Sequence, residues 1–87
     1  MKTVLVKVTQ EDIDNGVICS GGLCPIALAS AREFGLNTEV NKVRCRVFRE
    51  GRFVVDDYNL PRSARRFINR FDKGKIVKPF NFKLKVQ

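Results

Sequence analysis

Hydrophobic and polar residues alternate with a period of two near both ends of the chain. Three valines alternate with other residues in segment 2–8, and four apolar residues alternate with polar ones in segment 80–86. This alternation is typical of strands that bury one face. We expect the two terminal strands to lie together in one sheet.

Two helices are predicted in the first half of the chain. Thr9 is a suitable N-cap for a short helix or turn with acidic residues in its first turn, and Gly16 ends it. A second helix begins at Cys24-Pro25, since proline is tolerated in a first helical turn, and it ends at Gly35. Its apolar stripe predicts that this helix is largely buried.

A hairpin and a third helix are predicted in the second half. Segments 43–49 and 52–58 flank Glu50-Gly51, which is compatible with a hairpin turn. The third helix runs from about residue 62 to residue 73, after Pro61, and Gly74 ends it.

The element order is therefore β-α-α-β-β-α-β, without an internal repeat or a linker. A chain of 87 residues has room for one hydrophobic core, so residues 1–87 are expected to form a single domain. The simplest arrangement is an α+β fold with a small, mostly antiparallel four-stranded sheet and helices on one face.

Several classes of protein are disfavoured by the composition. No apolar run is long enough for a membrane span or a signal peptide, so we expect a cytoplasmic protein without a membrane partner. The three cysteines, Cys19, Cys24 and Cys45, are expected to be reduced, and without histidine they fall short of a closed zinc site. No nucleophile and base pattern is present, and Asp56 and Asp57 would point to opposite sides of a strand. We therefore expect no metal, no cofactor and no enzymatic activity.

The charge distribution indicates an anionic partner. The net charge is +8, but residues 1–41 carry −2 and residues 42–87 carry +10. The third predicted helix has an apolar face and an opposite basic face, whose arginines can grip phosphate oxygens. A solvated face that keeps a small protein soluble is the alternative. The candidate anion-binding residues are Arg62, Arg65, Arg66, Arg70 and Lys73 of this helix and Arg44, Arg46, Arg49 and Arg52 of the hairpin.

Two further candidate sites follow from local patterns. With Glu50-Gly51 as a two-residue loop, Phe48 and Phe53 would share a strand face with hairpin arginines and could stack on bases. They could equally be core residues beneath a helix, because a register change of one residue reverses the faces. The loop Ser20-Gly21-Gly22 precedes a helix N-terminus and is a possible phosphate loop, although a glycine-rich turn often needs no ligand.

Four short motifs occur along nearly the whole chain. They are Thr9-x-Glu11-Asp12-Ile13; Cys24-Pro25-Ile26-Ala27-Leu28-Ala29; Leu60-Pro61-x-x-Ala64-x-x-Phe67-Ile68-x-x-Phe71-Asp72-x-Gly74; and Val77-x-Pro79-Phe80-x-Phe82-x-Leu84. In this order they resemble a group of small, uncharacterised proteins encoded by phages and prophages. The resemblance implies the cytoplasm of a bacterial host as the setting, but it identifies no functional residues in this chain.

Three functions are compatible with these features. The first is a phage-type protein that binds nucleic acid through its basic helix and hairpin. The second is a counter-defence protein that sequesters a nucleotide immune signal or blocks a host defence complex. The third is an interaction protein whose basic face meets an acidic protein partner. Whether the chain forms a homo-oligomer stays open.

Overall fold

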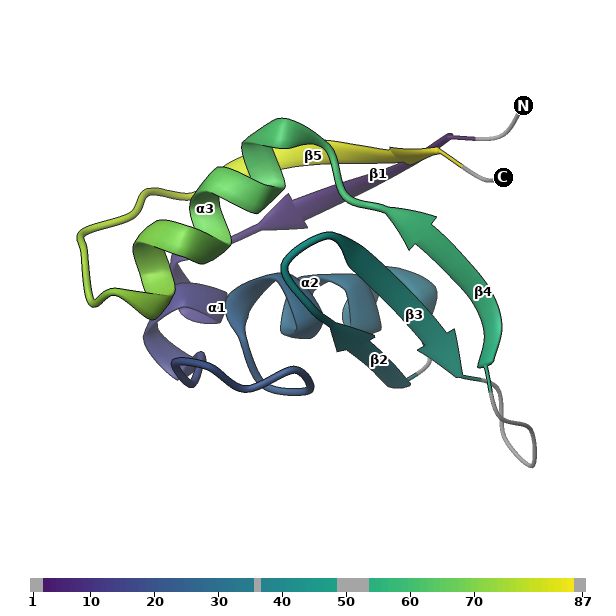
Figure 1. Cartoon of the computed structure of the whole chain (residues 1–87), viewed down its shortest axis with the longest axis horizontal. Helices are drawn as coiled ribbons and strands as arrows, with labels where there is room; N and C mark the ends of the chain where they lie inside the picture. Colours follow the sequence, from purple (N-terminus) through teal and green to yellow (C-terminus); the bar gives the residue numbers. More distant parts are fainter. Residues whose placement is uncertain (1–2, 36, 49–53, 86–87) are drawn as a thin grey trace.

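The described residues of the chain fold into two small antiparallel sheets and three helices (Figure 1). The computed structural model describes residues 3–35, 37–48 and 54–85. The strands are β1 (Thr3–Val8), β2 (Asn37–Val40), β3 (Arg44–Phe48), β4 (Val54–Asn59) and β5 (Phe80–Lys85), and the helices are α1 (Gln10–Asn15), α2 (Pro25–Phe34) and α3 (Arg62–Asp72).

The terminal strands pair as predicted, but the expected four-stranded sheet is wrong. β1 and β5 form a two-stranded sheet of their own, and β2, β3 and β4 form a second sheet in that order. α2 contacts both sheets, through β1 and through β2, so the helices do not cover one face of a single sheet. The two sheets meet where β4 contacts β5.

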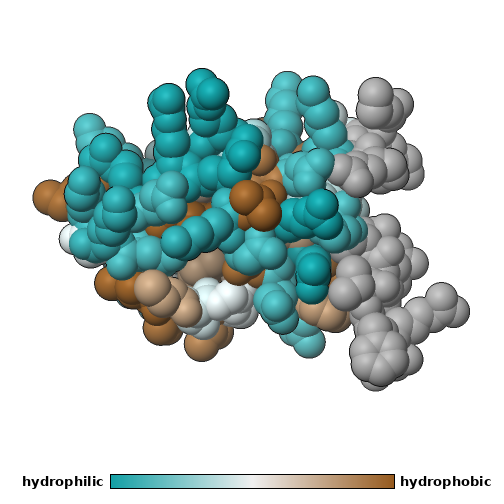
Figure 2. Space-filling model, in the orientation of Figure 1, coloured by the Kyte–Doolittle hydropathy of each residue, from teal (hydrophilic) through white to brown (hydrophobic). Residues whose placement is uncertain are grey.

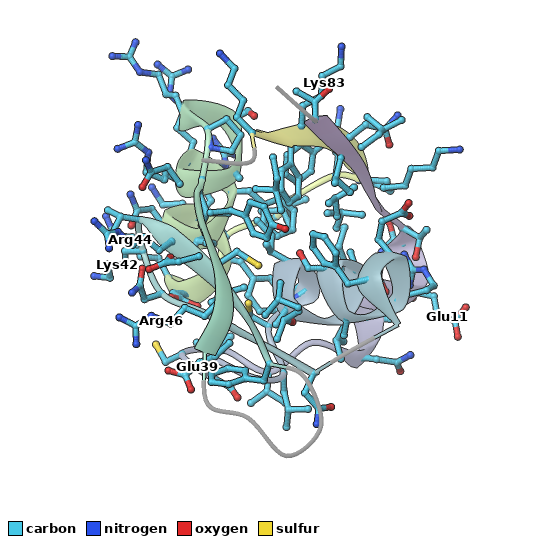
Figure 3. All side chains as sticks on the ribbon, turned by 90° about the vertical axis from the view of Figure 1, so that its right-hand side faces the viewer. Glu11, Glu39, Lys42, Arg44, Arg46 and Lys83 are labelled. Carbon is cyan, nitrogen blue, oxygen red and sulfur yellow. The ribbon has the colours of Figure 1, made fainter. Side chains whose placement is uncertain are left out.

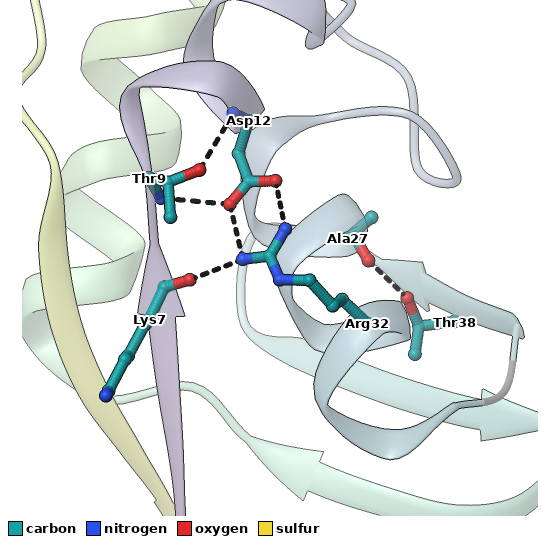
Figure 4. A network of polar contacts seen from close by, with 6 residues as sticks. All are labelled: Lys7, Thr9, Asp12, Ala27, Arg32 and Thr38. Atoms are coloured by element: carbon teal, nitrogen blue, oxygen red, sulfur yellow. Dashed lines mark hydrogen bonds and ion pairs between the residues drawn. The ribbon is translucent and has the colours of Figure 1, made fainter.

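Strand β2 is the element that the hydrophobic pattern does not predict. It has only four residues, of which Thr38 and Val40 are buried while Asn37 and Glu39 are exposed. The Thr38 hydroxyl donates a hydrogen bond to the carbonyl of Ala27, at 2.8 Å, which satisfies it inside the core (Figure 4). A polar residue therefore occupies a core position of this strand.

The helix boundaries follow the local signals closely. Thr9 caps α1 in a capping box with Asp12. α2 begins at Pro25 and ends at Phe34, and its C-cap is Gly35, whose φ of 66° is the left-handed conformation that favours glycine. α3 ends one residue earlier than predicted, with Lys73 as its C-cap.

The core is one cluster to which both sheets contribute. Val6 and Leu84 come from the two-stranded sheet, Cys45 and Val47 from the three-stranded sheet, and Ile26 from α2. Because α2 lies between the sheets, it connects their buried faces.

A polar cluster fastens α1 to α2 on the side of β1 (Figure 4). Arg32 donates to both carboxylate oxygens of Asp12, at 2.6 and 2.8 Å, and to the carbonyl of Lys7, at 2.8 Å. The same carboxylate accepts the backbone N–H of Thr9 at 2.9 Å. Three elements therefore depend on one buried carboxylate.

Gly16 is required by the packing of the α1–α2 connection. A Cβ at this position would lie 2.6 Å from Cδ and Cγ of Pro25. We expect Gly16→Ala to lower the free energy of unfolding by about 1–3 kcal/mol, because backbone must move to relieve the overlap. Gly22→Ala is the control, since nothing lies within 4 Å of its added Cβ. Urea denaturation of both variants tests this, and equal losses would contradict the assignment.

Candidate anion-binding surface

α3 presents one apolar face to the core and one basic face to solvent. Ala64, Phe67 and Ile68 are buried. The ring of Phe67 stacks on Phe80 of β5, with centroids 4.9 Å apart. Because these contacts fix the inner face, the opposite face is held outward. Its exposed cationic residues are Arg62, Arg65, Arg66 and Arg70, which we call the α3 arginines.

The α3 arginines are not neutralised by carboxylates of the described residues. Asp72 is the one acidic residue of α3, and its Oδ1 accepts the backbone N–H of Cys19 at 3.0 Å. Arg70 donates to the carbonyl of Ile76 at 3.4 Å. Within the described ranges, none of the ion pairs includes an α3 arginine. Their positive charge is therefore available to a ligand.

Two grooves flank this helix face. The first, of about 440 Å³, is lined by Lys42, Val43, Arg62, Arg65, Arg66 and Asn69, and we call it the basic groove. The second, of about 460 Å³, is lined by Ser63, Arg66, Phe67, Arg70, Ile76, Val77, Lys78 and Phe80, and we call it the mixed groove. Arg66 lines both grooves and so stands on the ridge between them. Lys42 and Lys78 extend the positive charge on either side.

Further cationic side chains lie on the same side of the molecule as α3. Figure 2 shows hydrophilic side chains gathered over α3 on the face toward the viewer. In Figure 3, Lys42, Arg44 and Arg46 project from the side on which α3 lies, where Glu39 also lies, and Glu11 projects from the opposite side. The cations on this side add to the positive field of the α3 arginines.

The hairpin arginines are partly neutralised. Asp57 of β4 lies 3.3 Å from Nη1 of Arg44 and 4.0 Å from Nε of Arg46. Glu39 of β2 lies directly opposite Arg46 in the strand pair. The face of the three-stranded sheet therefore offers less free positive charge than α3 does.

The sequence left the register of the hairpin open, and the strand pairing differs from that of a two-residue Glu50-Gly51 loop. A two-residue loop would place Arg46 opposite residue 55, whereas the structure pairs Arg46 with Asp57. An irregularity between Val47 and Phe48 then pairs Phe48 with Val54. A register shift of two residues leaves each side chain on the same face of the sheet. Cys45 and Val47 are therefore buried, as that face requires.

The structure describes only some of the other predicted residues of the hairpin and helix. Phe48 is half-buried, which leaves its stacking role a prediction. Arg49, Arg52 and Phe53 lie outside the described residues. Lys73 is exposed at the C-cap of α3, beside the α3 arginines in sequence. Lys42 was not predicted, because only the tertiary fold brings the β2–β3 turn against α3.

The loop Ser20-Gly21-Gly22 is placed beside a carboxylate. Ser20 and Gly21 line a pocket of about 230 Å³ together with Lys42 and Asp72. A Cβ on Gly21 would lie 3.3 Å from the carbonyl oxygen of Val40, so packing against β2 accounts for this glycine. The negative charge of Asp72 offsets the positive charge of Lys42. The loop pocket therefore has less free positive charge than the α3 surface has.

Comparison of the chain with protein-family models, with curated proteins and with solved structures found no match. The function of the chain is therefore inferred from its own residues.

Two of the three thiols are buried. Cys24 and Cys45 are buried, and Cys19 is exposed. Burial raises the pKa of Cys45 to about 11 and also raises the pKa of Cys24, so both stay protonated at neutral pH. Cys24 serves as N-cap of α2, where its Sγ accepts the N–H of Ala27 at 3.4 Å. Over the described ranges, no three Cys, Asp or Glu side chains are grouped as a metal site would require.

In the described part of the chain, no helix is both long and apolar enough to span a membrane.

Proposed function

We propose that the protein binds nucleic acid through the phosphate backbone, with the α3 arginines and the two flanking grooves as the interface. The observation that supports this most strongly is that four guanidiniums share one exposed helix face without an ion pair to a described carboxylate. Guanidinium groups bind phosphate oxygens bidentately and remain charged at any physiological pH.

The spacing of these arginines suits a repeating anion. Arg62, Arg66 and Arg70 follow one another at four-residue intervals, which places neighbouring side chains about 6 Å apart on the helix surface. From Arg62 to Arg70 the row is about 12 Å long. A row of this length can contact several successive phosphates of one strand.

The alternatives predicted from the sequence are less well supported. A protein that sequesters a small nucleotide needs an enclosing pocket, whereas the α3 arginines line open grooves and the loop pocket contains Asp72. An acidic protein partner would need carboxylates at matching intervals of about 6 Å, whereas every strand of nucleic acid carries regularly spaced phosphates. In the phage setting that the resemblance implies, the proposed role is that of a binding protein without catalysis in a bacterial host.

Salt dependence tests the proposal. Affinity for a fluorescein-labelled oligonucleotide, measured by anisotropy at about 50 to 200 mM salt, should fall steeply. If the α3 arginines and Lys42 or Lys78 each neutralise one phosphate, the slope of log K against log salt should be about −3 to −5. No binding at the lowest salt, or a slope near zero, would contradict nucleic acid as the ligand.

A further inference from the structure

The mixed groove differs in chemistry from the basic groove. Both have cationic rims, but the basic groove has one apolar side chain, Val43, and the mixed groove has four. These four are Phe67, Ile76, Val77 and Phe80. Phosphate binding alone does not explain why apolar side chains line a groove between cationic ones.

Ile76 is the most unusual of these residues. Its exposed fraction is 86%, the highest of the described large hydrophobic residues that stand exposed. Exposed apolar surface rimmed by polar groups is typical of a binding site. Here the rim consists of Arg66, Arg70 and Lys78, so the complementary ligand combines an apolar surface with adjacent negative charge.

The groove is held in shape without a ligand. The backbone N–H groups of Gly74 and Lys75 donate to the carbonyls of Phe71 and Arg70, at 3.0 and 2.9 Å. The side chain of Arg70 reaches the carbonyl of Ile76 at 3.4 Å. These bonds fix the α3–β5 connection against the helix, so the groove is preorganised.

We propose that the mixed groove takes an unpaired nucleobase, and hence that the ligand is single-stranded nucleic acid. This inference rests on the proposed function. A base would cover Ile76 and the edge of Phe80, while its flanking phosphates meet Arg66, Arg70 and Lys78. Paired bases inside a duplex cannot enter the groove, and a duplex would leave Ile76 in water. Stacking and apolar contact with a base are tolerant of sequence, because every base has a flat apolar face.

The test compares a complete and an abasic oligonucleotide of equal charge, and adds a duplex, which carries about twice that charge. Anisotropy is measured with an oligothymidylate of about 12 nucleotides, an abasic oligomer of the same length and a duplex of that length. We expect the oligothymidylate to bind about tenfold more tightly than the abasic oligomer. Ile76→Ser should remove this preference and leave the affinity for the abasic oligomer unchanged. Ile18→Ser is the matched control, because Ile18 is also exposed but lies in the α1–α2 connection.

The outcomes separate the two proposals. Equal affinity for the abasic and complete oligomers, or an oligothymidylate affinity that Ile76→Ser does not reduce, would overturn the assignment of the mixed groove and leave phosphate binding unaffected. Failure to bind any of the three would overturn phosphate binding itself. An acidic amphipathic peptide that binds more tightly than the oligothymidylate, and loses affinity in Ile76→Ser, would replace the nucleobase with a protein partner.

Discussion

Exchange of Arg62 and Arg66 for glutamate is expected to weaken oligonucleotide binding by about a hundredfold or more at about 100 mM salt. Each substitution removes a charge-assisted contact of about 1.5–3 kcal/mol and introduces repulsion of the phosphates. Arg66 lines both grooves, so its loss affects both flanks of α3. The slope of log K against log salt should also become shallower by about 2.

The control for this experiment is an equal change of charge on another face. Lys83 and Lys85 are exposed on β5, where they alternate with the buried Phe82 and Leu84. The Lys83→Glu, Lys85→Glu variant should keep most of the affinity. If both double variants lose affinity equally, net charge alone determines binding and the α3 surface is not a site. All four positions are exposed, so thermal melting curves should show that each variant remains folded.

Local signals in the sequence predict the helices and the terminal strands, but they do not predict which strands share a sheet. N-caps, prolines and glycines act within a few residues, and this is why the ends of α2 at Pro25 and Gly35 are correct. Sheet membership depends on where α2 packs, and α2 lies against both β1 and β2. Strand β2 is too short for its alternation to be recognised, and its buried Thr38 breaks the apolar pattern.

The candidate site, like the fold, can be predicted from the sequence only in part. The basic face of α3 follows from helical periodicity, so its arginines could be predicted from the sequence. The neutralisation of Arg44 and Arg46 by Asp57 depends on the register of β3 against β4, which the sequence does not determine. The mixed groove forms only when the segment that contains Ile76 returns beside α3. No short-range pattern marks this residue as part of a site.

Replacement of Arg32 by methionine is expected to lower the free energy of unfolding at neutral pH by about 2–3 kcal/mol. Methionine keeps much of the aliphatic stem but removes the guanidinium that pairs with Asp12. The Asp12 side chain is 5% exposed, so the variant would leave a buried carboxylate without its cation. Denaturation with urea measures the loss.

A second arginine provides a matched comparison. Arg44 has the same exposed fraction as Arg32, 52%, but its partner Asp57 is 34% exposed. Arg44→Met should therefore cost at most about 1 kcal/mol, as expected for a solvated ion pair. If the two variants lose equal stability, burial of the carboxylate is not what makes the Arg32 pair important.

The dependence on pH identifies the carboxylate of Asp12 as the cause. Burial raises its pKa, but the hydrogen bonds from Arg32 and Thr9 outweigh burial, and the pKa lies below its usual value of 3.8. A carboxyl whose pKa is lower in the folded state stabilises the fold above the unfolded pKa, and this contribution is lost as the pH falls through the folded pKa. The difference between the wild-type protein and Arg32→Met should therefore be full at neutral pH, shrink in acid as Asp12 of the variant is protonated first, and reach its minimum below the folded pKa of the wild-type carboxyl. A difference that stays constant over this range would mean that Arg32 acts through its contact with the Lys7 carbonyl or through packing, because neither of these titrates.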